Sequence, residues 1–345
     1  MRRRILSTLE TWADIPGWAD RVDSIALSRG ERGRTVASLL RLCLQGLCDG
    51  VKLWWLSRRY EAVITDSRLH VSVFGLLTRM TFWRKPRHLM FECLWQYPSG
   101  PLSRVLKTMQ FRAALTRRSR GIVYARRERD RFSACFGIPP ERFVFIPYHT
   151  TLRGFSHPPD CEQVPGRYAF AGGDTHRDYE TLCQAVTGLD LRVVIAARDH
   201  TPFKHLRVPP NVEIITTGEV EFLHWMLHAY VNIVPLQKGT LRSAGQQTFL
   251  NAMAFATPVI VTDVAGGGDY IENWVNGVVV EAADATQLRV ALVRLLNDPD
   301  LAARIGACAS VVRDDYATER ILNLCLDFLL SDQFDDPSCS EFLGR

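Results

Sequence analysis

The chain has 345 residues, of which 47% are hydrophobic and 23% charged. This length predicts about two domains, and the composition is that of a globular protein able to form two cores. Both exclude a disordered chain, a collagen-like chain and a small disulfide-stapled scaffold. The nine cysteines contain no CxxC pair, which argues against structural zinc or a disulfide framework and favours a reducing cytoplasm.

The net charge of +5 hides an asymmetry between the two halves. Residues 1–150 contain 27 Lys and Arg against 12 Asp and Glu, whereas residues 151–345 contain 15 against 25. A basic half joined to an acidic half suggests two units, the basic one facing an anionic partner. We expect no signal peptide, because Glu10 and Asp14 fall where an apolar segment would have to follow the N-terminal arginines.

The first half combines a long helix with short apolar runs. Residues 35–56 predict the helix, and a segment rich in Pro, His and Gly at 148–164 predicts a domain boundary. Four β-rich runs predict buried strands at residues 60–67, 88–95, 121–125 and 143–148.

The second half alternates strand and helix patterns, which is typical of a parallel sheet covered by helices on both faces. Six strands are expected at residues 168–171, 191–196, 212–216, 231–236, 259–262 and 278–281. Helices are expected between most of them, at residues 178–187, 219–229 and 243–255, and after the last strand at residues 285–296, 301–311 and 318–330. The polar tail after Ser331 is expected to be frayed.

Three segments of the second half carry residues suited to binding an anion. In the first, a strand ends in Gly172 and Gly173, and Arg177 stands just before the next helix. Glycines let the backbone approach a ligand, a helix N-terminus attracts negative charge, and a guanidinium can bind a diphosphate through two hydrogen bonds. The alternative is an ordinary strand-to-helix turn with a solvated arginine.

The second segment runs from Leu236 to Asp263 and contains a helix expected to begin near Ser243. Lys238 and Arg242 precede this helix, whose first turn offers unpaired N–H groups. Asn251 is polar within an otherwise apolar helix, so it needs a hydrogen-bonding partner, which is either a ligand or the core itself. The candidate binding residues here are Arg242, Ser243, Gln246, Gln247, Thr248 and Asn251. The third segment, Gly266–Gly268, is a glycine-rich loop after a buried strand.

Together these segments resemble the C-terminal half of GT-B glycosyltransferases, most closely the retaining enzymes of family 4. The shared features include "FAGGDTHRDY", "PPNVEII", "SAGQQTFLNAMAFATPVIVTDVAGG", "DYIENWVNGVVV" and "LLNDPDLAARIG". Their order and spacing hold over about residues 120–330. The resemblance implies an α/β protein of GT-B fold, in which two doubly wound Rossmann-like domains face a central cleft.

The chain departs from the family pattern at several positions. The two glutamates of the family's E-x7-E motif fall on Ser243 and Asn251, of which Asn251 can still bond a ribose hydroxyl. The family's phosphate-binding arginine falls on Gly173, whereas its lysine falls on Arg177, so that position stays cationic. The histidine of the family's N-terminal domain is missing. Glu92 stands in that region and is the polar group we expect beside the sugar or acceptor.

The resemblance implies a retaining, metal-independent glycosyltransferase that uses a nucleotide-diphosphate sugar, without a cofactor, in bacterial cell-surface polysaccharide or glycolipid synthesis. The expected catalytic residues are Arg177, Lys238 and Glu92, with Gly172 and Gly173 among those that bind the donor. Two alternatives remain open. One is a catalytically impaired GT-B partner or regulatory protein of polysaccharide assembly, and the other is a sugar-nucleotide epimerase. We expect no metal site; Asp298-Pro299-Asp300 imitates a DxD motif but reads as a turn between helices.

The basic half predicts where an acceptor would approach. Ten Lys and Arg between residues 100 and 132 alternate with apolar residues at helical intervals. Such a surface suits anionic headgroups, so residues 82–131 are expected to contact the inner face of the cell membrane. A glycan or lipid-linked acceptor would be presented there. A solvated helix face is the alternative, and no nucleic-acid partner is expected because no such motif is present.

The expected domains follow from these patterns. An N-terminal acceptor-side domain spans residues 1–150, and a C-terminal nucleotide-sugar domain spans residues 151–315. A helix at 316–330 is expected to pack back on the N-terminal domain, followed by the polar tail at 331–345.

Overall fold

The computed structural model describes residues 4–27, 36–81, 85–91, 93, 95–155, 167–264 and 266–343. The chain divides into two compact units: residues 1–147 together with 321–345, and residues 148–320. The sequence-based boundaries at 150 and 315 lie a few residues from these divisions. Helix α12 (Thr318–Leu330) carries the chain from the second unit into the first.

The first unit is built on a parallel sheet in the order β2-β1-β3-β4-β5-β6. Its strands are β1 Ile5–Ser7, β2 Val22–Ser24, β3 Ala62–Thr65, β4 Arg87–Met90, β5 Ser119–Val123 and β6 Phe143–Phe145. The last four overlap the runs that the sequence indicates, although β4 and β5 begin slightly earlier than predicted. β1 and β2 have three residues each, too short for a β-rich run to stand out.

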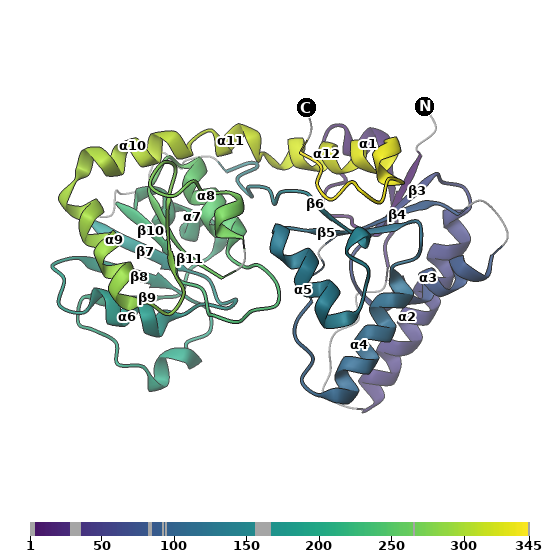
Figure 1. The fold of residues 1–345 in the computed structure, drawn as a ribbon, viewed down its shortest axis with the longest axis horizontal. Helices are drawn as coiled ribbons and strands as arrows, with labels where there is room; N and C mark the ends of the chain where they lie inside the picture. Colours follow the sequence, from purple (N-terminus) through teal and green to yellow (C-terminus); the bar gives the residue numbers. More distant parts are fainter. Residues whose placement is uncertain are drawn as a thin grey trace. The chain divides into compact units, whose positions relative to one another are not determined.

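Helices cover both faces of this sheet (Figure 1). The connections β2–α2–β3, β3–α3–β4, β4–α4–β5 and β5–α5–β6 step across the sheet in one direction, so right-handed crossovers place α2 to α5 on the same face. α1 and α12 lie on the other face. The helices of this unit are α1 Trp18–Arg21, α2 Val36–Ser57, α3 Leu69–Met80, α4 Pro101–Ala114 and α5 Arg126–Phe136, with a 3-10 turn η1 at Pro140–Arg142.

Strand β4 ends at Met90, whereas the sequence predicted a strand as far as Trp95. The reason lies in Trp95, which is 3% exposed and stacks on Phe111 with ring centroids 3.8 Å apart. Phe136 and Phe143 also contact the indole, at 5.5 and 5.6 Å. The chain therefore leaves the sheet so that the indole can enter the aromatic core beneath α4 and α5.

The C-terminal tail is packed on the first unit, so the expectation of a frayed tail is wrong. Phe334, in the 3-10 turn η4 (Asp332–Phe334), is 2% exposed, and the N–H of Phe145 donates to the Ser340 carbonyl at 2.9 Å. The buried guanidinium of Arg120 donates to the carbonyls of Phe334, Asp336 and Glu141. The packing of the tail could not be predicted from its polar composition, because only a few buried contacts and the buried cation of Arg120 hold the segment in place.

The second unit holds a parallel sheet in the order β12-β11-β10-β7-β8-β9. Its strands are β7 Tyr168–Gly172, β8 Arg192–Ala196, β9 Val212–Ile215, β10 Val231–Val234, β11 Val259–Asp263 and β12 Val278–Glu281. All six match predicted runs, because β7 and most of β8 and β11 are continuous buried apolar stretches and β10 is interrupted only by the buried Asn232. The strand order reverses between β7 and β10.

The helices of the second unit overlap the predicted ranges, except that α11 (Val312–Asp315) was not predicted. α10 begins at Pro299 instead of Leu301, and the start of α8 is also displaced. That helix begins at Gln246 rather than near Ser243, because Gly245 adopts a left-handed conformation with φ +83° and caps it. Asp298 caps α10 by accepting the Leu301 N–H at 2.9 Å, as the turn interpretation predicted. The bounds are α6 Tyr179–Val186, α7 Glu219–His228, α8 Gln246–Ala254, α9 Ala285–Asn297, α10 Pro299–Ala309 and α11 Val312–Asp315, with 3-10 turns η2 Thr201–His205 and η3 Gly267–Asp269.

Among the described residues, no helix is both long enough and apolar enough to cross a bilayer.

Candidate functional site

The loop between β7 and α6 lies at the point where the strand order of the second sheet reverses. The N–H of Asp178 donates to the Pro235 carbonyl at 2.9 Å, and the N–H of Gln237 donates to the His176 carbonyl at 2.9 Å. These bonds join the loop to the segment that follows β10. Ligands of open α/β sheets bind beyond the carboxyl ends of the strands at such a reversal, so the predicted residues of both segments converge on the expected place.

Arg177 is the central cation of this loop and is 8% exposed. Its Nε donates to the Gly172 carbonyl at 2.8 Å, Nη1 to the Thr175 carbonyl at 2.9 Å, and Nη2 to Thr248 Oγ1 at 2.9 Å. Burial lowers the pKa of the guanidinium, which nevertheless stays charged because its intrinsic value is so high. Within the described part of the chain no carboxylate lies within ion-pair distance of it, although the charge of Asp174 acts on it from farther away.

Gly173, the second glycine of the motif, has a structural role in the loop. The N–H of Gly173 donates to the Ala196 carbonyl at 3.0 Å, and its carbonyl accepts the Tyr179 hydroxyl at 2.5 Å. Gly173 has φ +106°, and a Cβ there would lie 2.8 Å from Arg177 Nη2. The glycine therefore makes room for the Arg177 guanidinium, while its own N–H is already engaged.

The N-terminus of α8 meets Arg177 through Thr248. The first bond within this helix runs from the Phe249 N–H to the Gly245 carbonyl at 2.9 Å, so the N–H groups of the first turn, at Gln246, Gln247 and Thr248, have no partner inside the helix. The Gln246 side chain is 6% exposed, and its buried Nε2 has no hydrogen-bonding partner among the described residues. A buried cation, a helix N-terminus and an unsatisfied amide thus lie together.

Asn251 is 2% exposed and bonded to the chain just after the domain boundary. Its Oδ1 accepts the Thr151 N–H at 2.9 Å, and its Nδ2 donates to Thr151 Oγ1 at 2.9 Å. Gln247 Nε2 also reaches Thr151 Oγ1, at 3.1 Å. The amide therefore finds its partner in Thr151, which corresponds to the satisfied-core alternative that the sequence left open.

The other predicted residues differ in their placement. Lys238 is exposed in the turn after β10, Arg242 is half-buried, and Ser243 is 4% exposed. Glu92 lies outside the described residues. In the third segment, Gly267, Gly268 and Asp269 form the 3-10 turn η3.

His176 is a neighbour of the site that the sequence analysis missed. It adopts φ +53°, and its Nε2 is buried without a hydrogen-bonding partner among the described residues. Burial, together with the charges of Arg242 and Arg177, lowers the pKa of its imidazole. The sequence offered one indication of this role, which is the position of His176 directly before Arg177 in the loop between the glycine pair and α6.

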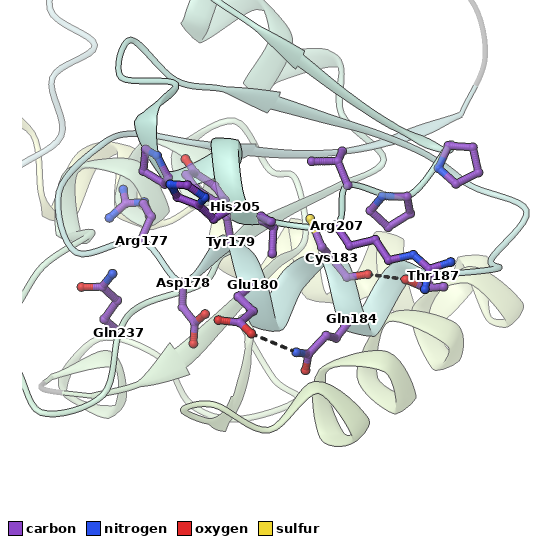
Figure 2. A pocket seen from close by; sticks show the side chains of 15 residues that line it. Arg177, Asp178, Tyr179, Glu180, Cys183, Gln184, Thr187, His205, Arg207 and Gln237 are labelled. Carbon is purple, nitrogen blue, oxygen red and sulfur yellow. Dashed lines mark hydrogen bonds between the residues drawn. The ribbon is translucent and has the colours of Figure 1, made fainter.

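A hollow of about 780 Å³ begins at Arg177 and Gln237 and extends along α6 (Figure 2). Asp178, Glu180 and Gln184 lie along the helix side of it, while His205 ends η2 and Arg207 follows that turn. The hollow is therefore a depression of mixed polar and apolar lining with a cation at one end, large enough for a nucleotide-sized ligand.

The sequence and the fold were each compared with those of known proteins. Residues 174–298 match the family model for group 1 glycosyl transferases. The matched stretch lies within the second unit and contains Arg177, the first turn of α8 and Asn251. No curated protein matches the sequence.

Solved structures resemble the chain over nearly its whole length. A glycosyltransferase from Rickettsia africae has a TM-score of 0.67 at 14% identity, covering 96% of this chain and 91% of that one. HepE of Anabaena in complex with UDP has a TM-score of 0.67 at 13% identity, covering 95% and 99%. WaaG, a glycosyltransferase involved in lipopolysaccharide biosynthesis, has a TM-score of 0.62 at 15% identity, covering 90% and 87%. The predicted GT-B fold is confirmed.

Proposed function

We propose that the chain is a glycosyltransferase that moves a sugar from a nucleotide-diphosphate sugar to a glycan or lipid-linked acceptor. The observation that carries the proposal is the buried guanidinium of Arg177, which is bonded to the first turn of α8 at the point where the strand order reverses between β7 and β10. The match to group 1 glycosyl transferases and the fold shared with HepE, which was crystallised with UDP and with UDP-glucose, support it.

The chemistry requires stabilisation of a leaving group. As the bond between the anomeric carbon and the diphosphate oxygen breaks, the electron pair stays on the diphosphate, and an acceptor hydroxyl forms the new bond and loses its proton. Arg177 would offset the charge that develops on the diphosphate. The N–H groups of α8 and the amide of Gln246 would add hydrogen bonds, which are strong where water is excluded.

Lys238 and Arg242 supply further positive charge near the same loop, so we propose that the reaction proceeds without a metal. Retention of the anomeric configuration is proposed from the family resemblance, and Glu92 as a group beside the sugar or acceptor is proposed on the same ground. Because WaaG acts in lipopolysaccharide biosynthesis, a cell-surface glycan or glycolipid is the acceptor class that we propose.

A direct test is release of nucleoside diphosphate from a panel of nucleotide sugars, with and without glycan and lipid-linked acceptors and with and without EDTA. We expect at least one donor to be consumed, EDTA to have no effect, and the Arg177→Ala variant to lose most of the activity. Arg192→Ala is the matched control in the same unit, since Arg192 forms an exposed ion pair with Glu213 at 2.7 Å. No release from any donor would contradict the proposal.

One observation favours the second candidate, a GT-B partner protein that has lost catalysis. Asn251 and Ser243 stand where the family has carboxylates, and the Asn251 amide is engaged by Thr151. A protein of this kind would bind a nucleotide sugar without consuming it. The same panel separates the two functions, because stabilisation against heat by a donor without release of diphosphate would favour the partner protein.

A further inference from the structure

The first unit carries a concentration of exposed apolar side chains. Among the residues that the structure describes, eighteen large apolar side chains are exposed, and twelve of them lie on α2, α3 and α4. They are Leu40, Leu44, Leu47, Val51 and Trp55 on α2, Leu69, Leu76 and Met80 on α3, and Leu102, Val105, Leu106 and Met109 on α4. Single exposed apolar residues are ordinary, but a cluster of this size marks an interaction surface.

The α2 residues form one stripe because they follow one another at intervals of three or four residues. The opposite side of α2 faces the unit: a Cβ at Gly50 would lie 2.5 Å from Val73 Cβ, and Leu53 is fully buried. The stripe therefore points away from the core. At its end, the Arg58 guanidinium lies 3.2 Å from the centre of the Trp55 ring, which pairs an amphipathic ring with a cation.

Helices α3 and α4 continue this surface because they pack closely against their neighbours. A Cβ at Gly46 of α2 would lie 2.9 Å from the Leu69 side chain of α3. On the other side of α3, Ser72 Oγ donates to the Gln110 carbonyl of α4 at 3.0 Å. The three helices thus form one layer on the same face of the sheet (Figure 1). We call their exposed residues the α2–α4 face.

The charge of the α2–α4 face has a single sign. Its helices contain six Lys and Arg, and their one carboxylate, Asp49, is 9% exposed. The cations are Arg41, Lys52, Arg79, Arg104, Lys107 and Arg112. An apolar surface flanked by cations complements an anionic bilayer, where each Lys or Arg near the surface contributes about 1 kcal/mol.

We propose that the α2–α4 face docks the protein on an anionic lipid bilayer, with the α2 stripe among the acyl chains and the cations at the headgroups. A second copy of the chain is a poorer occupant. An isologous dimer would bring the same cations together, and no exposed carboxylate on these helices could neutralise them.

The location of the α2–α4 face also suggests how an acceptor would reach the protein, an inference that rests on the proposed glycosyltransferase function. α4 follows the carboxyl end of β4, and Leu102, Val105 and Leu106 lie in the first half of α4. The face therefore borders the edge of the first sheet where a ligand of that unit would bind. A bilayer at this edge would deliver an acceptor with a lipid tail. The sequence suggested a membrane contact by residues 82–131; the α2–α4 face includes α4 from that range but has α2 as its main apolar element.

The test is flotation of the full-length chain with vesicles of phosphatidylcholine alone or with 30% phosphatidylglycerol, a composition that we choose to be strongly anionic. We expect binding to the anionic vesicles only, weakened by salt. The triple variant Leu40→Gln, Leu44→Gln, Leu47→Gln should bind at least about tenfold more weakly, a change of about 1.4 kcal/mol.

The matched control is Val220→Gln, Val290→Gln, Val311→Gln, because these valines of the second unit are 58%, 61% and 58% exposed. Nucleotide-sugar binding by the leucine variant should equal that of the unmodified protein, which shows that the variant is folded and separates this proposal from the function proposed above. Absence of vesicle binding by the unmodified protein, or an equal loss of vesicle binding in both triple variants, would overturn the proposal that the α2–α4 face docks on a bilayer. A lipid-free dimer that the leucine substitutions dissociate would instead assign the face to self-association and equally overturn the proposal.

Discussion

The Arg177 guanidinium occupies the space that any side chain at position 173 would need, since a Cβ on Gly173 would lie 2.8 Å from Arg177 Nη2. In the family that the sequence resembles, position 173 carries an arginine and position 177 a lysine. Here the longer side chain at 177 turns back over a glycine and supplies the cation from the other end of the loop. The position of the Arg177 guanidinium therefore requires that residue 173 has no side chain.

Gly173→Ala should therefore destabilise the second unit by about 2–3 kcal/mol, because it combines a strained left-handed backbone with a clash against a buried cation. Gly188→Ala is the matched control. Gly188 also has a positive φ, of +73°, but a Cβ there would meet no atom within 4 Å. Urea unfolding should show a smaller loss for the control, and equal losses would contradict the close approach.

Asn251→Ala should lower the free energy of unfolding of the second unit by about 1–3 kcal/mol, because the Thr151 N–H and hydroxyl lose their buried partner. Asn251→Asp keeps the bond to the Thr151 N–H and should recover part of that loss. Thermal unfolding of the two variants checks the order. A stable Asn251→Ala protein that fails to bind nucleotide sugars would show that Asn251 serves the ligand and not the fold.

His88 predicts a dependence of stability on pH. It is 1% exposed between Thr65 Oγ1, at 2.9 Å, and Ser119 Oγ, at 3.0 Å, and burial lowers the pKa of the imidazole to about 3. The folded state keeps the ring neutral while the unfolded chain takes up a proton below about pH 6.5. Stability should thus be complete above that pH and fall between about pH 6.5 and 3, by at most about 1.4 kcal/mol per pH unit.

Urea unfolding followed by tryptophan fluorescence between pH 4 and 7 measures this dependence, since six of the eight tryptophans precede residue 148. His88→Gln can still donate and accept hydrogen bonds but does not titrate, so it should flatten the profile. A profile unchanged by this substitution would assign the pH dependence to other groups.

Phe334→Ala should destabilise the first unit by about 3–5 kcal/mol, as expected for a buried aromatic residue. The ring is 2% exposed and lies 5.3 Å from that of Phe328. Leu343→Ala is the control in the same tail, because Leu343 is 50% exposed. A small effect of Phe334→Ala in calorimetry would mean that the tail contributes little to folding.

The strands of the second unit could be predicted from the sequence because its buried strands are continuous apolar runs and its turns carry glycine or proline. Gly245 explains the displaced start of α8: whether a glycine caps or continues a helix depends on its φ, which composition does not specify. β1 and β2 were missed because three residues are too few for a pattern.

The candidate site was predicted only in part. Arg177 and the first turn of α8 could be found because cations, glycines and helix starts are visible in the sequence. The partners of Asn251 and Gly173 could not, because Thr151 and Ala196 are distant in the sequence and nothing about their residue types indicates the contact. The exposure of the α2 stripe could not be predicted for a similar reason. An apolar helix is expected to be buried, and only the positions of its neighbours show which of its side chains remain exposed.

The central claim is that Arg177 and the first turn of α8 bind the diphosphate of a nucleotide sugar. The most direct measurement is calorimetric titration of nucleoside diphosphates and the matching monophosphates into the unmodified protein and into Arg177→Ala. The account predicts that one nucleoside diphosphate binds at least about tenfold more tightly than its monophosphate, a preference worth about 1.4 kcal/mol that Arg177→Ala abolishes. Equal preference in both proteins would contradict it.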